Sequence, residues 1–232
     1  MAASEQRRTL LEADWLGFAR RATDAVRRVV ERYPTAAERG AETGRGEGGD
    51  TAYVIDREAE DAIFAELEAL GEPVTAISEE RGEVQVLGGG PVHVVIDPID
   101  GSLNAKRGLP FPSVSIAVAT GSRMEHVELG YVAEIQSRRE WWARSGEGAF
   151  EDGERLQALE PGRLDAMVTL GPVRSVDSAA GQLVVREAGG AVAFPEGGDD
   201  EAPLALDRRS RVLAARDAQL LARLRATFRT SS

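Results

Sequence analysis

The chain has 232 residues, enough for one large domain or two small ones. Hydrophobic residues make up 42% and charged residues 29%, a composition typical of a soluble globular protein. The formal net charge of −11 argues against a nucleic-acid backbone or an anionic membrane as partner. Cysteine is absent, which excludes disulfides and cysteine-ligated metal sites, so a metal must use oxygen ligands or the two histidines, His93 and His126.

The N-terminal sequence, MAASEQRRTL, lacks the apolar core of a secretory signal peptide. No apolar run approaches the ~20 residues that a membrane-spanning helix needs. We therefore expect a cytoplasmic protein.

The first part of the chain predicts two amphipathic helices. Apolar residues recur at three- and four-residue spacing from Leu11 to Tyr33, which predicts a helix over residues 5–33. A second helix is predicted over residues 56–70, with Gly71 as its C-cap. Residues 35–50 between them carry five glycines and no apolar periodicity, so we predict a mobile loop or a weak hairpin.

The remainder predicts strands with interspersed helices. Strands are predicted at 73–78, 92–96, 113–119, 128–135, 139–143, 166–170, 191–194 and 211–214, and helices at 177–187 and 217–228. The segment 146–156 is predicted to consist mainly of turns. Uneven alternation of helices and strands favours a mixed α/β (α+β) fold. We predict an N-terminal domain over 1–155 and a C-terminal domain over 156–232.

The most informative segment for chemistry is VVIDPIDGSLNAKRGLP, residues 94–110. A buried strand delivers Asp97, and Asp100 follows three residues later. Two carboxylates this close at a strand end repel each other unless a cation lies between them. Gly101 and Ser102 then begin a turn or helix whose free N–H groups can face an anion. The alternative is an Asp-rich turn in which Asp97 only caps the following helix.

Other acidic residues are ambiguous when each is considered alone. Glu79 and Glu80 follow a predicted strand, where a solvated loop pair is the simpler interpretation. Asp56 and Asp177 each stand at the start of a predicted helix, where an N-cap is the simpler interpretation. The order and local context of the whole set are more specific than any member.

These motifs together resemble the inositol monophosphatase family, which includes archaeal-type fructose-1,6-bisphosphatases. The resemblance is carried by VIDREAEDAI, ISEERGE, DPIDGSLNAKRGLPFPSVSIAVA, WWARSGEGAFEDGERL and VRSVDSAAGQLVVREAGG. Ser102 stands where threonine is more usual, and Val176 where many members have tryptophan. The resemblance implies a layered αβαβα sugar-phosphatase sandwich, here with an abridged C-terminal half.

The resemblance also implies a role for each matched residue. Glu79, Asp97 and the carbonyl of Ile99 bind one Mg²⁺, and Asp97, Asp100 and Asp177 bind a second. A third, weakly bound Mg²⁺ uses Glu79 as a ligand, and Mn²⁺ can substitute for Mg²⁺. Backbone N–H groups of Gly101 and Ser102 hold the phosphate. The catalytic set is Asp56, Glu79 and Ser102, in which Asp56 and the Ser102 hydroxyl orient and help to deprotonate the attacking water.

The implied function is Mg²⁺-dependent hydrolysis of a small phosphorylated metabolite, such as inositol-1-phosphate or fructose-1,6-bisphosphate, by a cytoplasmic homodimer. Two departures from the family concern the substrate: the chain is short between Gly153 and Asp177, and Leu170 and Gly171 stand where animal members have an acidic residue for an inositol hydroxyl. The alternative is a relative with little or no activity that binds metal and phosphate, or a protein partner. A calcium-loop protein is disfavoured because the acidic residues are not packed into one short loop.

Overall fold

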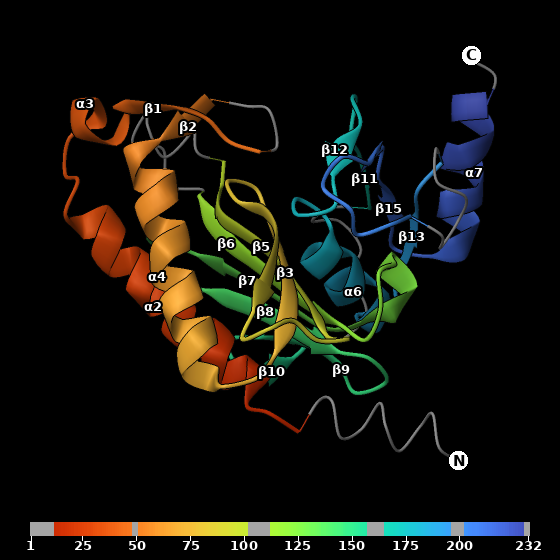
Figure 1. Cartoon of the computed structure of the whole chain (residues 1–232). Helices are drawn as coiled ribbons and strands as arrows, with labels where there is room; N and C mark the ends of the chain where they lie inside the picture. Colours follow the sequence, from red (N-terminus) through yellow and green to blue (C-terminus); the bar gives the residue numbers. More distant parts are fainter. Residues whose placement is uncertain (1–11, 48–50, 102–111, 157–164, 196–201, 230–232) are drawn as a thin grey trace.

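The computed structural model describes residues 12–47, 51–101, 112–156, 165–195 and 202–229. Its centre is an eight-stranded sheet with the order β10-β9-β8-β7-β6-β5-β3-β4 (Figure 1). The strands are β3 (Val74–Ser78), β4 (Gly82–Val86), β5 (His93–Asp100), β6 (Ser113–Ala119), β7 (Val127–Glu134), β8 (Glu140–Arg144), β9 (Gly148–Glu151) and β10 (Glu154–Arg155). Among the described strands of this sheet, β3–β5 is the one parallel pair.

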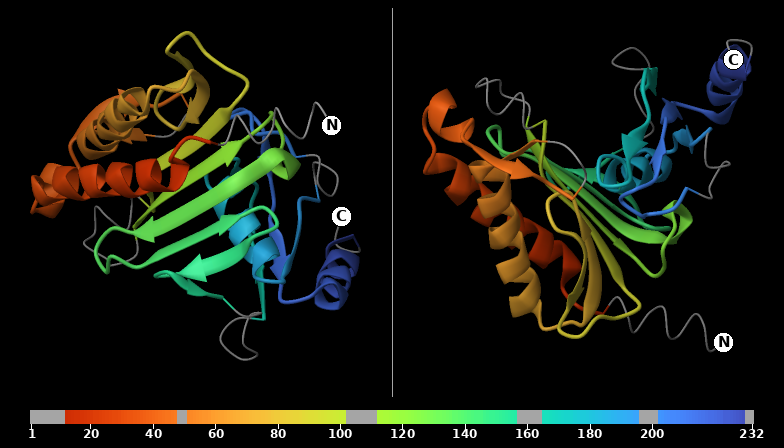
Figure 2. Two further views of the ribbon diagram at one scale, coloured as in Figure 1. Left: turned by 90° about the horizontal axis from the view of Figure 1, so that it is seen from below. Right: turned by 45° about the horizontal axis from the view of Figure 1, so that its top comes forward.

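Helices α2 (Trp15–Glu31) and α4 (Val54–Leu70) pack against each other and cover one face of the sheet (Figures 1 and 2). Their inward residues, such as Phe18 and Ile63, meet alternate strand residues such as Ile96 and Ile116, all fully buried. Because strand side chains alternate between faces, the intervening residues of the same strands face the opposite layer. The sheet is therefore buried on both sides at its centre.

Helix α6 (Ala179–Glu187) covers the other face, where Ala180 and Leu183 pack with Val95 and Ala117. Beyond α6 lies a three-stranded sheet with the order β11-β15-β13, formed by β11 (Ala166–Val168), β13 (Ala191–Ala193) and β15 (Leu213–Ala215). Helix α7 (Ala218–Arg229) packs on this small sheet through Leu221 (Figure 1). The layers follow in the order helix, sheet, helix, sheet, helix, so the predicted αβαβα fold is confirmed.

The glycine-rich segment after α2 contains a short helix, α3 (Ala36–Arg39), and a hairpin of β1 (Glu42–Arg45) and β2 (Thr51–Tyr53). Of the two predictions for 35–50, the hairpin is therefore the one the structure contains. A separate two-stranded ribbon joins β12 (Val173–Arg174) to β14 (Arg209–Ser210). Met124–His126 forms a 3₁₀ turn, η1.

Some predicted boundaries were wrong. Helix α2 begins at Trp15 and leaves out residues 12–14, because Asp14 accepts a hydrogen bond from the N–H of Gly17 at 2.9 Å and caps the helix there; the predicted stretch 5–11 lies outside the described residues. The segment 146–156, predicted to be turns, contains the β9–β10 hairpin. Strand β4 was not predicted. The division into 1–155 and 156–232 stays a prediction, and no described helix is long and apolar enough to cross a membrane.

One close approach fixes α6 against the sheet and gives a stability prediction. A Cβ atom on Gly130 of β7 would lie 2.4 Å from the carbonyl oxygen of Ala180 in α6. We expect Gly130→Ala to lower the free energy of unfolding by about 1–3 kcal/mol, because helix and sheet must separate. The matched control is Gly181→Ala in α6, where a Cβ would meet nothing within 4 Å and helix propensity improves. Urea unfolding that shows equal stability for both variants would contradict this contact.

Candidate active site

The parallel pairing of β3 and β5 brings the first two candidate residues to one edge of the sheet. Ser78 and Ile96 are the last register partners of the two strands, so β3 ends beside the point where β5 reaches Asp97. Glu79 follows Ser78 directly, and Asp97 follows Ile96. Because neighbouring parallel strands end at the same edge, Glu79 and Asp97 lie close together there.

Pro98 explains how Asp100 joins them. Proline has no N–H to donate to the sheet, and the pairing of β5 with β6 shifts register between Asp97 and Asp100. Within this irregularity the N–H of Ile99 donates to Oδ1 of Asp97 at 3.1 Å. Gly101 follows with a φ of 83°, a conformation that glycine adopts easily. Its N–H donates to the carboxylate of Asp100 and so faces the acidic edge.

Asp177 comes from the far side of the sequence and is placed by a buried serine. Ser115 of β6 is the register partner of Asp97, and its hydroxyl donates to the carbonyl of Val176 at 3.4 Å. This contact docks the segment before α6 beside Asp97. Oδ2 of Asp177 also accepts the N–H of Arg174 at 2.8 Å, which orients its carboxylate.

The carboxylates at this edge interact strongly. Burial raises the pKa of Asp97, which is 2% exposed, well above its usual range, and the charges of Asp100, Glu79 and Asp177 raise it further. For Asp100 the first cause is again desolvation, followed by Asp177 and Glu79, and its pKa is raised to about 6. The charge of Asp177 therefore acts on both aspartates.

Arg174 is the basic side chain that lowers the pKa of both Asp97 and Asp100. Its guanidinium donates to Oε1 of Glu79 at 2.6 Å and lies 3.9 Å from Oδ2 of Asp177. No sequence pattern singled out this residue. Its contact with Glu79 depends on the fold, which brings β12 next to the end of β3.

A second group of acidic residues, Asp56, Glu60 and Glu80, lies beside the cluster formed by Glu79, Asp97, Asp100 and Asp177. Burial raises the pKa of Glu80 to about 7, and the charges of Asp56, Glu79 and Glu60 add to the effect. Asp56 is 4% exposed near the start of α4, where its Oδ2 accepts the N–H of Tyr53 at 3.4 Å. Glu60 is buried one turn later and its Oε1 accepts the N–H of Glu80 at 3.3 Å. Asp56 therefore caps α4 and also faces the acidic edge through Glu80.

The donor set suits a hard divalent cation. Carboxylate oxygens are the ligands that Mg²⁺ and Mn²⁺ prefer, and such a cation removes the repulsion that raises the pKa values of Asp97 and Asp100. Within the described ranges, however, no three Asp, Glu or His side chains are grouped closely enough to hold one ion. The chemistry of the residues thus fits a metal, whereas the side-chain arrangement includes an arginine bonded to Glu79.

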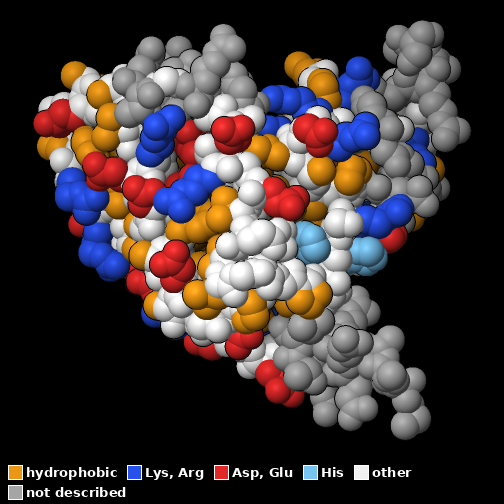
Figure 3. Space-filling view, viewed as in Figure 1, with side chains coloured by type: hydrophobic (Ala, Val, Ile, Leu, Met, Phe, Trp, Pro, Cys, Tyr) orange, Lys and Arg blue, Asp and Glu red, His pale blue; other side chains and the backbone are white. Residues whose placement is uncertain are grey.

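The structure places most of the predicted residues near one another. The residues brought together are Glu79, Asp97, Ile99, Asp100, Gly101 and Asp177. Asp56 interacts with Glu80, the neighbour of Glu79 in the chain. Ser102 lies outside the described residues. Residues that the sequence analysis missed are Ser115 and Arg174, since neither belongs to a motif that predicts its partner. On the face shown in Figure 3, acidic and basic side chains are interspersed over α4.

The sequence profile of the inositol monophosphatase family matches residues 11–162, more than half of the chain. The chain belongs to this family, which confirms the resemblance drawn from its motifs. The matched range includes Asp56, Glu79, Asp97 and Asp100, whereas Asp177 lies beyond its end.

Similar proteins cover most of the chain. A fructose-1,6-bisphosphatase/inositol-1-monophosphatase of Methanothermobacter thermautotrophicus is 29% identical over 261 residues, covering 89% of this chain and 93% of that protein. One of Archaeoglobus fulgidus is 36% identical over 149 residues, covering 64% and 56%. The crystal structure of an inositol monophosphatase–fructose 1,6-bisphosphatase superposes with a TM-score of 0.78 at 22% identity, covering 90% and 97%. At that identity the structural likeness shows the fold.

The raised pKa of Asp100 gives a pH prediction for the metal-free protein. Its pKa is about 6 in the folded state against 3.8 for an ordinary aspartate, so the folded state holds its proton longer. Stability therefore falls as pH rises from about 4 to about 6. We expect Asp100→Asn, in a chelator, to melt slightly above wild type at pH 7.5 and with no such advantage at pH 3.5; the gain is small because residue 100 is exposed and solvent screens part of the repulsion. Asp24→Asn on the surface of α2 is the control, and an equal gain at both pH values would refute the prediction.

Proposed function

We propose that the protein is a Mg²⁺-dependent phosphomonoesterase that acts on a small sugar or inositol phosphate. The observation that carries the proposal is the meeting of Glu79, Asp97, Asp100 and Asp177 at one edge, where their charges raise the pKa values of Asp97 and Asp100. Such a cluster is costly in a metal-free protein and useful in one that binds divalent cations. Membership of the inositol monophosphatase family supports the same chemistry.

Four carboxylates would hold two Mg²⁺ ions: Glu79 and Asp97, with the carbonyl of Ile99, would hold one, and Asp97, Asp100 and Asp177 the other. Bound divalent cations neutralise a phosphate dianion, stabilise the leaving oxygen and lower the pKa of water. Asp97 is the residue shared by both ions in this assignment. Its position, 2% exposed and hydrogen-bonded to the N–H of Ile99, fixes it more firmly than the outer Asp100.

The remaining residues would position the phosphate and the attacking water. Gly101 and Ser102 would hold the phosphate oxygens through backbone N–H groups. In the metal-free structure the Gly101 N–H donates to the carboxylate of Asp100. Asp56 and the Ser102 hydroxyl would orient the attacking water and accept its proton. Asp56 is buried, and its charge is one of the causes that raise the pKa of the neighbouring Glu80 to about 7.

The substrate is a small phosphate monoester. Several relatives are described as fructose-1,6-bisphosphatase/inositol-1-monophosphatase, and one of Mesorhizobium japonicum as inositol-1-monophosphatase. In this chain Leu170 is 94% exposed just after β11, at the place where an acidic residue would contact inositol. We therefore expect fructose-1,6-bisphosphate to be turned over at least as well as inositol-1-phosphate.

The direct test is phosphate release with and without Mg²⁺. We expect wild type to release phosphate from fructose-1,6-bisphosphate or inositol-1-phosphate only when Mg²⁺ or Mn²⁺ is present. Asp97→Asn should lower kcat by about 100-fold or more, because it removes the carboxylate that would hold both cations, whose positive charge would stabilise the developing phosphate charge. Asp24→Asn, a surface change of the same chemistry, should leave kcat within about twofold.

Two outcomes would overturn the proposal. One is activity that persists in a chelator, and the other is a folded Asp97→Asn variant with wild-type kcat. A wild-type protein that binds Mg²⁺ and phosphate without turnover would instead support the alternative, a non-catalytic relative.

A further inference from the structure

Arg174 occupies an unusual place for a basic side chain. It lies on β12, its side chain is 9% exposed, and it contacts Glu79 at 2.6 Å and Asp177 at 3.9 Å. Both contacts are with residues assigned above to metal binding. A guanidinium therefore lies where positive charge is most needed in the metal-free protein.

The backbone of Arg174 is anchored as firmly as its side chain. Its N–H donates to Oδ2 of Asp177 at 2.8 Å, and its carbonyl accepts the hydroxyl of Ser178 at 3.2 Å. Arg174 pairs in register with Arg209 of β14, which fixes the β12 ribbon. From this anchored position the guanidinium crosses to the end of β3. The ion pair thus ties the segment before α6 to the large sheet.

We propose that Arg174 is the resident counter-cation of the acidic edge, which holds Glu79 in the absence of metal and must leave Glu79 when a divalent cation binds. The inference rests on the proposed function, because it assigns Glu79 to metal binding. Arg174 is accordingly a positioning residue that sets the metal affinity of the site.

The reason is competition for the same oxygen atoms. Oε1 of Glu79 accepts a short, charge-assisted hydrogen bond from Arg174, and that bond must break before Glu79 can ligate a cation. A divalent cation carries twice the charge of a guanidinium and is a better counter-ion for several carboxylates. The exchange therefore favours metal binding. The free energy of binding is smaller than it would be if Glu79 were not bonded to an arginine.

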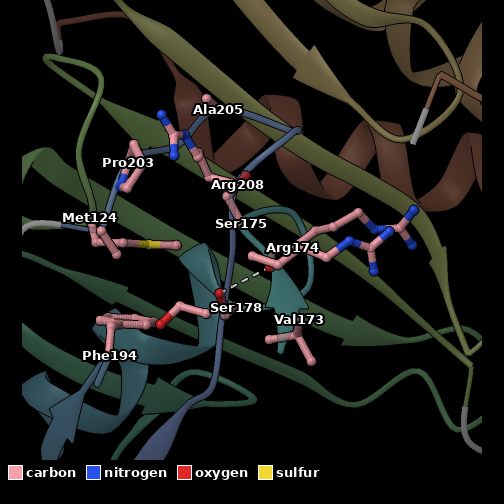
Figure 4. A pocket seen from close by; sticks show the side chains of 12 residues that line it. Met124, Val173, Arg174, Ser175, Ser178, Phe194, Pro203, Ala205 and Arg208 are labelled. Carbon is pink, nitrogen blue, oxygen red and sulfur yellow. Dashed lines mark hydrogen bonds between the residues drawn. The ribbon is translucent and has the colours of Figure 1, made fainter. Parts of the chain in front are cut away.

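The structure also leaves room for the displaced side chain. Arg174 lines a cavity of about 330 Å³ together with Met124, Ser175, Ser178 and Phe194. Figure 4 shows that its side chain now extends away from Met124 and Phe194. Rotation about its side-chain bonds can move the guanidinium off Glu79 without moving the β12 backbone, which Asp177 and Ser178 hold.

The test is Mg²⁺ affinity measured by isothermal titration calorimetry on the full chain without substrate. Arg174→Met keeps the length of the side chain and removes its charge. We expect it to bind Mg²⁺ on the order of tenfold more tightly than wild type, equivalent to about 1.4 kcal/mol. In a chelator it should melt below wild type, and saturating Mg²⁺ should close most of that gap. The matched control is Arg208→Met, which changes an exposed arginine that lines the same cavity. This control variant should bind Mg²⁺ with the affinity of wild type.

Mg²⁺ affinity of Arg174→Met equal to or weaker than wild type would overturn the inference. If wild type itself binds no Mg²⁺, the proposed function fails first, so the two failures are distinguishable. Arg174→Lys covers the case in which the methionine variant does not fold. In wild type, the ¹⁵N-edited NMR signal of the Arg174 Nε–H, assigned by its loss in Arg174→Lys, should shift along the same Mg²⁺ titration. A signal that does not move would also reject the displacement.

Discussion

Repulsion among the carboxylates at the ends of β3 and β5 is the constraint on which the rest of the site depends. Asp97 is almost fully buried, and its pKa is raised by burial and by the charges of Asp100, Glu79 and Asp177. A fold does not gather such groups for stability, because each added charge at this edge costs free energy. The arrangement becomes favourable when positive charge is present, from Arg174 in the metal-free protein and from divalent cations in the proposed enzyme.

The fold holds these charges together through rigid backbone contacts. Parallel pairing aligns Glu79 with Asp97, the register shift at Pro98 exposes Asp100, and the hydroxyl of Ser115 docks the segment before Asp177. Each of these contacts lies at the end of a buried strand or beside one. A site built on such elements keeps its geometry while a side chain such as Arg174 exchanges partners.

Much of this could be predicted from the sequence, because the informative residues sit in local patterns. The buried strand before Asp97, the cap at Gly71 and the five-layer fold were all predicted, the last from motif resemblance. The Arg174–Glu79 contact could not be predicted, since it joins residues 95 positions apart and neither position specifies the other. Strand β4 and the β9–β10 hairpin were missed because they lie in segments rich in turn residues, where long-range pairing decides the structure.

In the proposed enzyme, divalent cations replace Arg174 among these carboxylates. The most direct measurement is a crystal structure of the protein soaked in Mn²⁺, with the anomalous scattering of manganese used to locate the ions. We expect anomalous density bounded by the carboxylates of Asp97, Asp100 and Asp177, with the guanidinium of Arg174 no longer bonded to Glu79. Manganese absent from this edge, with the Arg174–Glu79 contact intact, would contradict this expectation.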